Sequence, residues 1–430
     1  MSASLLLILT EFPPSFGGMQ THAVELCRYL HGQGFRIEVA TYRAIEGPAA
    51  TPVFPFAVHR CMSRISYQAN LRRLSALADS SGADLIYSST VYFGDLAHRT
   101  GLPVICRSAG NDVMRPWIAW PFKTGSTILD QPFFEHHLYQ RLKRWSWPEA
   151  CEGLLLKQRY EVMRRSARSM SRIFANSQYT QSLLSAQAIA RERIALLPGG
   201  VDVDAFAHSG ELRKDLRARL GLRGDGHYLL TACRLVRKKG LDTLLQAVAQ
   251  LRQSDPSVHL IIVGEGGERK ACEHWIESLG LSGAVSLLGY LPQAQLKDYF
   301  HACDSFVLSS REVVNPKNGL KDAETMGRVL CEANACGIPV IASNSGGIPS
   351  VISDGVNGLL VDEGSPAAFA ESVRRLQKDS ALANVLVRGG LERARKHFDW
   401  KVLFAAHEKA IRGLVGGERL VRSHSRESNL

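Results

Sequence analysis

Short runs of apolar, often β-branched residues alternate with helical patterns along nearly the whole chain. Continuous apolar strands separated by helices are typical of parallel sheets that helices cover on both faces. The pattern therefore predicts an α/β fold. The expected strands are residues 5–9, 36–41, 85–88, 103–107, 172–176, 228–232, 259–263, 285–289, 305–308, 340–343 and 359–361.

The second half of the chain repeats the plan of the first, and 430 residues exceed what one hydrophobic core usually supports. A Pro-Gly-Gly breaker begins at Pro198, and a new strand follows at Tyr228. We expect a first α/β domain at 1–198, with an irregular insertion at about 113–170, and a second at 199–396. A helix at 397–415 is expected to cross back to the first domain, and the polar, basic segment 416–430 is expected to be disordered.

The net charge and the spacing of the cysteines limit the classes of function that the chain can have. A net charge of +11 indicates an anionic partner, and nucleic acid, anionic lipid and phosphorylated small molecules all qualify. Nine scattered cysteines without a Cys-x-x-Cys pair argue against a disulfide framework and a zinc site. The first apolar run, 5–9, is too short for a membrane span or a signal peptide, so a cytoplasmic location is expected.

Two segments have features typical of phosphate-binding sites. Gly17, Gly18 and Met19, followed by His22, stand between a strand and a helix, where backbone N–H groups can approach an anion. Arg234 and Lys239 lie in a basic loop after the strand at 228–232, where like charges repel unless solvent or an anion separates them. A tight turn and a solvated basic loop are the structural alternatives.

Two glutamates with seven residues between them lie at a predicted helix at 327–335. Glu324 precedes this helix, Glu332 lies inside it, and a carboxylate can accept hydrogen bonds from two vicinal hydroxyls. Glycines also follow two other strands, at Gly264 and at Gly346–Gly347, where they permit close approach of a ligand to the backbone. The glycine segments and the basic loop lie at the carboxyl ends of strands, where ligands of α/β folds bind.

In this order the motifs resemble the retaining GT-B glycosyltransferases of family four. The resemblance covers most of the chain and implies two facing Rossmann-like domains with the active site in a cleft. It also implies a nucleotide-sugar donor, no catalytic metal, no further cofactor, and a sugar or lipid-linked acceptor. Arg234, Lys239 and Glu324 would be the catalytic residues, and the other donor contacts would be Gly17, Gly18, Gly264, Met326, Gly327 and Glu332.

The chain departs from the family pattern at two places. Thr325 and Met326 stand where the family often has Gly-Phe, so bulkier side chains would reshape the sugar pocket. Ala109 stands where the family often has a histidine near the anomeric carbon, although Gly110 and Asp112 keep their places. Asn111, Asp112 and His22 remain candidate acceptor contacts, and a structural turn is an equal alternative for 111–112.

The basic stretch 141–172 has two interpretations: an amphipathic helix on an anionic membrane surface, or the solvated face of an ordinary helix. The first would place the protein peripherally on the inner face of the membrane. A GT-B epimerase or a sugar phosphorylase would share the sheets, but the paired glutamates favour a transferase. A nucleic-acid-binding protein would need a basic and aromatic platform or a recognition helix, and the sequence shows neither. A non-catalytic subunit is a further alternative, because Ala109 stands in place of the family's histidine.

Overall fold

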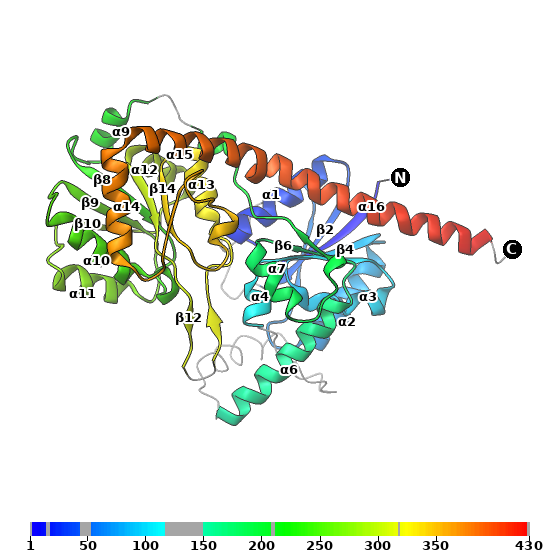
Figure 1. Ribbon diagram of the computed structural model, residues 1–430. Coiled ribbons are helices and arrows are strands. Elements are labelled where there is room, and N and C mark those ends of the chain that lie inside the picture. Colours follow the sequence, from blue (N-terminus) through cyan, green and yellow to red (C-terminus); the bar gives the residue numbers. More distant parts are fainter. Residues whose placement is uncertain are drawn as a thin grey trace. The chain divides into compact units, whose positions relative to one another are not determined.

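The computed structural model describes residues 2–13, 18–43, 53–116, 149–207, 211–316 and 319–427. The chain divides into two compact units (Figure 1). Unit 1 comprises Met1–Pro198 and Phe404–Leu430, and unit 2 comprises Gly199–Leu403. Each unit is built on its own parallel sheet, so the predicted α/β class with two Rossmann-like domains is confirmed.

Unit 1 contains a seven-stranded parallel sheet in the order β3-β2-β1-β4-β5-β6-β7. Its strands are β1 (Ser4–Ile8), β2 (Arg36–Tyr42), β3 (Ala57–Met62), β4 (Leu85–Ser88), β5 (Val104–Ser108), β6 (Arg172–Ala175) and β7 (Ile194–Leu196). Its helices are α1 (Gly18–Gly32), α2 (Tyr67–Ser80), α3 (Leu96–Thr100), α4 (Asn111–Met114), α6 (Glu149–Arg168) and α7 (Gln178–Ser185), with 3-10 turns η1 (Val91–Phe93) and η3 (Arg191–Arg193).

The sequence analysis did not predict the two edge strands of this sheet, β3 and β7. The central strands β1, β4 and β5 are buried throughout, which explains their continuous apolar runs. Strand β3 is half-buried and includes His59 and Arg60, and β7 is only three residues long. An edge strand covers less of the core, so its sequence carries a weaker apolar signal.

Unit 2 contains a six-stranded parallel sheet in the order β10-β9-β8-β11-β14-β15 and an antiparallel hairpin β12-β13. The strands are β8 (His227–Ala232), β9 (Val258–Val263), β10 (Val285–Gly289), β11 (Ser305–Leu308), β12 (Val313–Val314), β13 (Lys321–Asp322), β14 (Val340–Ser343) and β15 (Leu359–Val361). The helices are α8 (Val203–Phe206), α9 (Arg213–Arg219), α10 (Leu241–Arg252), α11 (Arg269–Ser278), α12 (Gln293–Ala302), α13 (Arg328–Cys336), α14 (Pro366–Lys378) and α15 (Ser380–Arg393), with 3-10 turns η4 (Arg237–Lys239) and η5 (Ile348–Ser350) and a π-helical turn, η6 (Ala394–Phe398).

Alternate residues of the unit 2 strands point to opposite faces of the sheet, and each face has its own core. Leu230 and Ile261 pack with Phe300 of α12 and Leu330 of α13. Their neighbours along the strands, including Leu229 and Ile262, pack in a second cluster with residues of α10 and α14. Helices therefore cover both faces, and this arrangement exposes only the ends of the strands to ligands.

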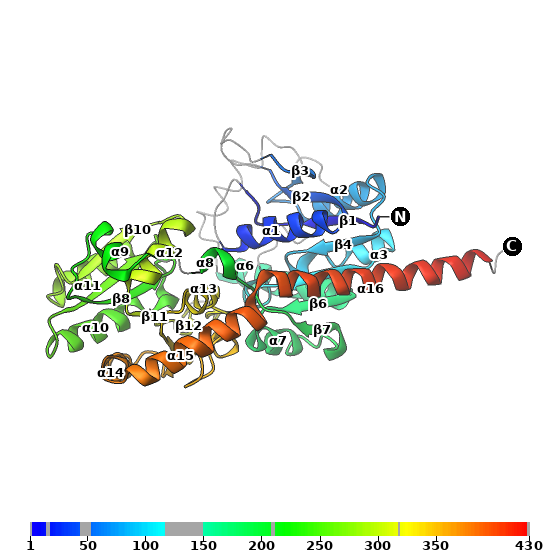
Figure 2. The same ribbon diagram turned by 90° about the horizontal axis from the view of Figure 1, so that it is seen from above.

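Helix α16 (Trp400–Glu427) begins in unit 2 and belongs to unit 1 from Phe404 onward. There it runs beside α1, as Figure 2 shows: the Tyr29 hydroxyl donates to Glu408 at 2.9 Å, and Arg412 donates to the carbonyl oxygen of Gln33 at 3.1 Å. The helix continues to Glu427, where the sequence analysis expected disorder from residue 416. Glu, Arg and Leu residues in 418–422 favour helix and offset the glycines at 416 and 417.

Candidate functional site

The candidate donor residues of unit 2 gather where β8, β9, β11 and β14 end. The loop after β8 leads into η4 and α10, and Gly240 joins them in a left-handed conformation (φ 59°). A Cβ at Gly240 would lie 2.2 Å from the carbonyl oxygen of Ser309, so only glycine allows this approach. The Ser309 hydroxyl also donates to the carbonyl oxygen of Lys239 at 2.9 Å. The basic loop is therefore fixed against the end of β11.

Lys239 and Glu324 form an ion pair at this edge, and both side chains are largely buried. Burial opposes the charge on each of them, but the mutual attraction outweighs it. The pKa of Glu324 is lowered because Lys239, Lys238 and Arg234 together overcome the effect of burial. The pKa of Lys239 is raised because Glu324 does the same for the ammonium. The sequence analysis placed both residues in the donor site, and the structure pairs them directly.

Lys238 is a site residue that the sequence analysis did not single out. Its side chain is 5% exposed, and its Nζ lies 2.9 Å from Oδ1 of Asp322 and 2.9 Å from the carbonyl oxygen of Ala323. It therefore anchors the end of the β12-β13 hairpin immediately before Glu324. Its signal in the sequence was hidden because it stands in the run Arg237-Lys238-Lys239, where every residue is basic.

The glycine pair after β14 contacts the Glu324 segment. A Cβ at Gly346 would lie 2.2 Å from the carbonyl oxygen of Glu324, and one at Gly347 would lie 1.9 Å from that of Thr325. The Gly347 N–H donates to the Glu324 carbonyl oxygen at 2.7 Å. The sequence analysis expected these glycines to admit a ligand. In the structure the backbone of Glu324 and Thr325 occupies the space beside these glycines.

Gly264 has a similar packing role at the end of β9. Its φ of 135° disfavours other residues, and a Cβ there would lie 1.9 Å from the carbonyl oxygen of Cys233. Gly266 approaches the carbonyl oxygen of Leu235 in the same way. These contacts hold the loop after β9 against the loop after β8, which contains Arg234. Arg234 itself is exposed.

Helix α13 carries the second glutamate. Gly327 precedes it in a left-handed conformation (φ 82°) and makes no side-chain cap, so the N–H groups of the first turn have no partner within the helix. Glu332 is 5% exposed and pairs with Arg328 at 2.9 Å, and burial raises its pKa despite this arginine. The Met326 side chain is buried, and its sulfur accepts a hydrogen bond from the Gly199 N–H at 3.1 Å. The Met326 side chain thus makes a core contact, and the reshaping of a sugar pocket by Thr325 and Met326 stays a prediction.

In unit 1, Asn111 and Asp112 begin α4 at the end of β5. The Asp112 carboxylate accepts from the Ser108 hydroxyl at 2.7 Å and from the Val91 N–H at 3.0 Å. Burial raises the pKa of Asp112, although these hydrogen bonds oppose the shift. Asp112 thus ties β5 to η1, and its role as an acceptor contact stays a prediction. Oδ1 of Asn111 is buried and has no hydrogen-bond partner among the described residues.

His22 lies in α1 with its ring buried against Phe404 and near His407 of α16. It lines a small cavity of about 20 Å³ together with Tyr87 and Arg107. This space is sufficient for a water molecule and too small for a sugar. Gly18 is the first residue of α1. Gly17 and most of the predicted insertion, residues 117–148, lie outside the described residues.

No group of three or more His, Cys, Asp or Glu residues that could hold a metal ion occurs in the described part of the chain. Nor does any helix within the described ranges have the length and apolar character needed to cross a bilayer.

Two family descriptions match the chain and together cover most of it. "Glycosyltransferase Family 4" matches residues 16–205, and "Glycosyl transferases group 1" matches residues 213–393. The chain belongs to the glycosyltransferases of family four. The first match falls on unit 1 and extends to residue 205 in unit 2, and the second falls within unit 2.

Curated relatives of this family-four chain include a D-inositol 3-phosphate glycosyltransferase of Catenulispora acidiphila, 35% identical over 56% of the chain and 58% of the relative. Another is a GDP-mannose-dependent α-(1-6)-phosphatidylinositol monomannoside mannosyltransferase of Mycolicibacterium smegmatis, 31% identical over 55% of the chain and 61% of the relative. These matches span less than two thirds of either relative.

Solved structures share the fold of the family-four chain. Sucrose-phosphate synthase of Thermosynechococcus elongatus has a TM-score of 0.74 at 20% identity, with 96% of this chain and all of the other covered. The Anabaena protein HepE in complex with UDP and glucose has a TM-score of 0.69 at 21% identity, with 95% and 98% covered. The fold is therefore GT-B.

Proposed function

We propose that this family-four chain transfers a sugar from a nucleotide-sugar donor to a hydroxyl of a sugar or lipid-linked acceptor. The observation that carries the proposal is the buried Lys239–Glu324 pair at the carboxyl edge of the unit 2 sheet. The pair keeps an ammonium and a carboxylate charged side by side, next to the exposed Arg234. An ammonium and a guanidinium suit a diphosphate, and a carboxylate suits the hydroxyls of a sugar.

The catalytic contribution of these residues would be electrostatic. When the bond between the sugar and the diphosphate breaks, negative charge develops on the leaving group. Arg234, Lys239 and the N–H groups at the start of α13 would stabilise this charge. We propose that the configuration at the anomeric carbon is retained and that the leaving diphosphate helps to deprotonate the acceptor, so that neither a protein nucleophile nor a metal ion is required.

Glu332 would bind the ribose hydroxyls of the donor. Its carboxylate is buried and pairs with Arg328, which leaves it able to accept further hydrogen bonds. Unit 2 would then be the donor domain, with Gly18 and Asn111 of unit 1 as candidate contacts to phosphate and acceptor.

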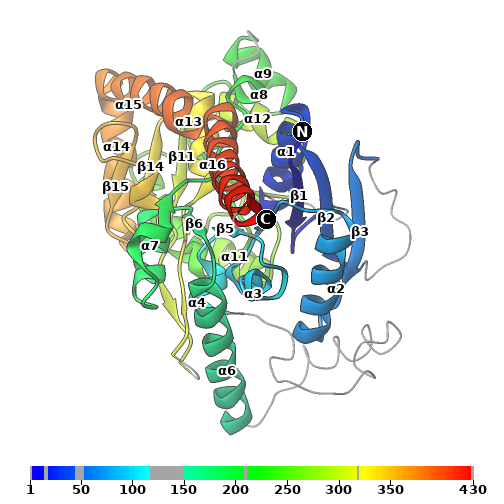
Figure 3. The ribbon, with the colours of Figure 1, turned by 90° about the vertical axis from the view of Figure 1, so that its right-hand side faces the viewer.

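We also propose that the protein associates with an anionic membrane surface through α6. The N-terminal part of this helix extends away from the sheet of unit 1 (Figures 1 and 3), and Leu154 is 54% exposed. Arginines occupy exposed positions farther along the same helix. A helix with exposed leucine and arginine side chains is suited to the boundary between lipid headgroups and water.

Thermal unfolding of the full chain with UDP-, GDP-, ADP- and TDP-sugars tests the donor proposal. One nucleotide class should raise the unfolding temperature of the wild type and of Lys270→Ala, an exposed lysine of the same unit. Lys239→Ala and Glu332→Ala should abolish this shift. Loss of one leaving-group contact should also reduce donor hydrolysis by about 10²–10³-fold. Absence of a shift with every nucleotide would overturn the proposal.

Two further measurements address the chemistry. Donor hydrolysis or transfer should persist after metal ions are removed with EDTA, and NMR of the product should show the anomeric configuration of the donor. Loss of activity that returns with a divalent metal ion would contradict the metal-independent mechanism. Inversion of the anomeric configuration would contradict the proposed retaining mechanism.

A further inference from the structure

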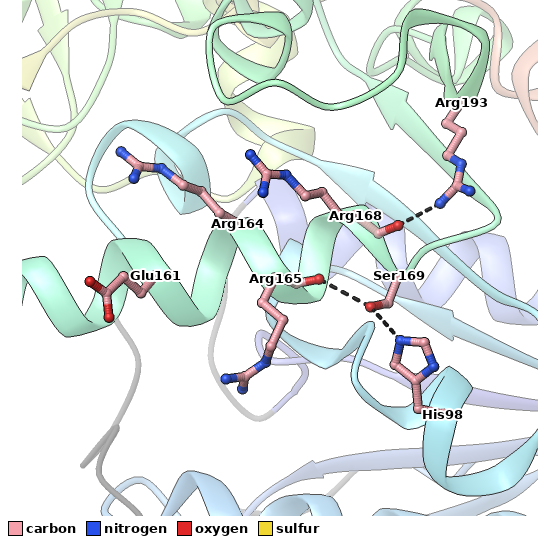
Figure 4. A pocket seen from close by; sticks show the side chains of 7 residues that line it. All are labelled: His98, Glu161, Arg164, Arg165, Arg168, Ser169 and Arg193. Atoms are coloured by element: carbon pink, nitrogen blue, oxygen red, sulfur yellow. Dashed lines mark hydrogen bonds between the residues drawn. The ribbon is translucent and has the colours of Figure 1, made fainter.

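The C-terminal end of α6 lines a cationic cavity in unit 1, with a volume of about 680 Å³ (Figure 4). Helix α6 contributes Arg164, Arg165 and Arg168, and η3 contributes Arg193. A volume of this size is in the range of ligand-binding pockets in proteins. The candidate donor and acceptor residues described above do not line it.

The cavity lies at the opposite edge of the unit 1 sheet from the candidate acceptor residues. Its walls come from the ends of α3, α6 and η3, and these elements lead into the amino ends of β5, β6 and β7. Asn111 and Asp112 instead follow the carboxyl end of β5. The cavity is thus a separate site, away from the edge where α/β folds usually bind nucleotides.

Hydrogen bonds fix the walls of this cavity. Arg193 donates to the carbonyl oxygens of Arg168, the last residue of α6, and of Met170, which follows the helix. The Ser169 hydroxyl donates to the carbonyl oxygen of Arg165 at 3.0 Å and lies 2.9 Å from Nε2 of His98 in α3. Figure 4 shows the contact of Arg193 with Arg168 and those of Ser169 with Arg165 and His98. The arginines therefore extend from a constrained backbone.

Only one of the four arginines is neutralised by a carboxylate within the described part of the chain. Arg165 forms an ion pair with Asp95 at 2.5 Å. Arg164 donates to the side-chain oxygen of Gln187 at 2.8 Å, and Arg168 donates to the carbonyl oxygen of the same residue at 3.2 Å. Both of these acceptors are uncharged.

Arg164 and Arg168 are therefore held on the same side of α6, one turn apart, with their charges uncompensated (Figure 4). Like charges at this spacing repel each other, and an anion between them would remove the repulsion. Glu161, the acidic residue of the lining, makes no ion pair with a described residue.

We propose that this cavity binds a phosphate group, with Arg164 and Arg168 as its principal donors. The guanidinium group presents several N–H donors in a planar fork that matches the oxygens of a phosphate, and charge-assisted bonds of this kind are strong. The phosphate can belong to a lipid headgroup or to a soluble phosphomonoester, because the same two guanidinium groups would recognise both.

The test compares the full-length wild type with Arg164→Ala/Arg168→Ala. Isothermal titration with sn-glycerol 3-phosphate measures the soluble ligand, and flotation with vesicles of phosphatidylcholine and phosphatidylglycerol in equal parts measures the headgroup. We expect the double variant to weaken at least one of these interactions by about tenfold or more. Loss with vesicles alone identifies a headgroup site, and loss with the soluble phosphate alone identifies a phosphomonoester site.

The matched control is Arg99→Ala/Arg191→Ala, which removes the same charge from exposed residues of unit 1 outside the cavity. An equal loss in this control would show non-specific attraction and overturn the proposal. So would retention of both interactions in Arg164→Ala/Arg168→Ala, or loss of the soluble ligand in Lys239→Ala alone, which would place the phosphate in the donor site.

A conservative variant separates recognition from folding. Arg164→Lys/Arg168→Lys keeps the charge and removes the fork, so phosphate binding should fall between those of the wild type and the alanine variant. Nucleotide-sugar binding should be unchanged in the variants at Arg164 and Arg168 and in the Arg99→Ala/Arg191→Ala control, since these residues lie outside the proposed donor site. Failure of nucleotide binding in the wild type would therefore reject the proposed donor function and leave the phosphate proposal intact.

Discussion

The ammonium group of Lys238 lies 2.9 Å from Oδ1 of Asp322 and 2.9 Å from the carbonyl oxygen of Ala323. The next residue is Glu324, which pairs with Lys239, the neighbour of Lys238. Two consecutive lysines of η4 thus bind consecutive residues of the segment 322–324. One fixes the backbone before the glutamate, and the other contacts its carboxylate.

Lys238 should therefore act as a positioning residue for Glu324. In Lys238→Met, Asp322 and the Ala323 carbonyl oxygen lose their buried donor, which should lower the free energy of unfolding by about 1–3 kcal/mol. We expect the turnover number for donor hydrolysis to fall while binding of the free nucleoside diphosphate is kept, because the cations of the loop remain. Lys238→Arg should recover part of the turnover.

The control for Lys238 is Lys270→Met, which replaces an exposed lysine of unit 2. This variant should match the wild type in stability and in hydrolysis. Equal turnover in Lys238→Met and the wild type would contradict the positioning role, whatever the change in stability.

The Lys239–Glu324 pair predicts a specific pH dependence of stability. The folded state lowers the pKa of Glu324, so its contribution is complete above the ordinary glutamate pKa of 4.5 and is lost as the pH falls through the lower folded value. Chemical denaturation at pH 7 should show Glu324→Gln less stable by about 3 kcal/mol, since it leaves a buried lysine without its partner. The difference should shrink below pH 4.5.

At alkaline pH the same pair should depend on Lys239. Its folded pKa is raised, so its contribution is complete below the ordinary lysine pKa of 10.5 and is lost as the pH rises through the higher folded value. The double variant Lys239→Met/Glu324→Gln should show neither the acidic nor the alkaline loss of stability that this pair produces. A pH-independent difference between Glu324→Gln and the wild type would argue against a charged pair.

Gly347 should tolerate no side chain. In Gly347→Ala the new Cβ would meet the carbonyl oxygen of Thr325 at 1.9 Å, so the backbone beside Glu324 must move. We expect a loss of about 1–3 kcal/mol in stability and a loss of donor binding in thermal-shift measurements. Gly267→Ala is the control, because the space around Gly267 is open. Wild-type donor binding in Gly347→Ala would show that the Glu324 segment accommodates the shift.

Helix α16 should contribute to the stability of unit 1. Ile411 is fully buried on this helix, and Ile411→Ala should lower the free energy of unfolding by about 2–5 kcal/mol through lost burial and the cavity left behind. Lys409→Ala, at an exposed position of the same helix, should change it by less than about 0.5 kcal/mol. Urea denaturation of both variants checks this. Equal stability would indicate that α16 packs only loosely on unit 1.

The sequence by itself determined the α/β class and the buried strands. Strands β4, β11 and β14 have the bounds that their apolar runs predict, because a strand buried on both faces needs apolar residues throughout. The edge strands β10 and β15 also have their predicted bounds, although β10 is only partly buried. The same rule fails for β3, which lies at an edge, and for the two-residue strands β12 and β13.

Tertiary structure alone decided which residues meet at the unit 2 site. The sequence marked Arg234, Lys239 and Glu324 by their charge and position, but it could not show that Lys239 pairs with Glu324 across 85 residues of chain. Nor could it show that Lys238 holds Asp322, or that Gly346 and Gly347 make room for backbone. Charge and backbone freedom are local properties of a residue, whereas its partner is set by the packing of loops at the ends of different strands.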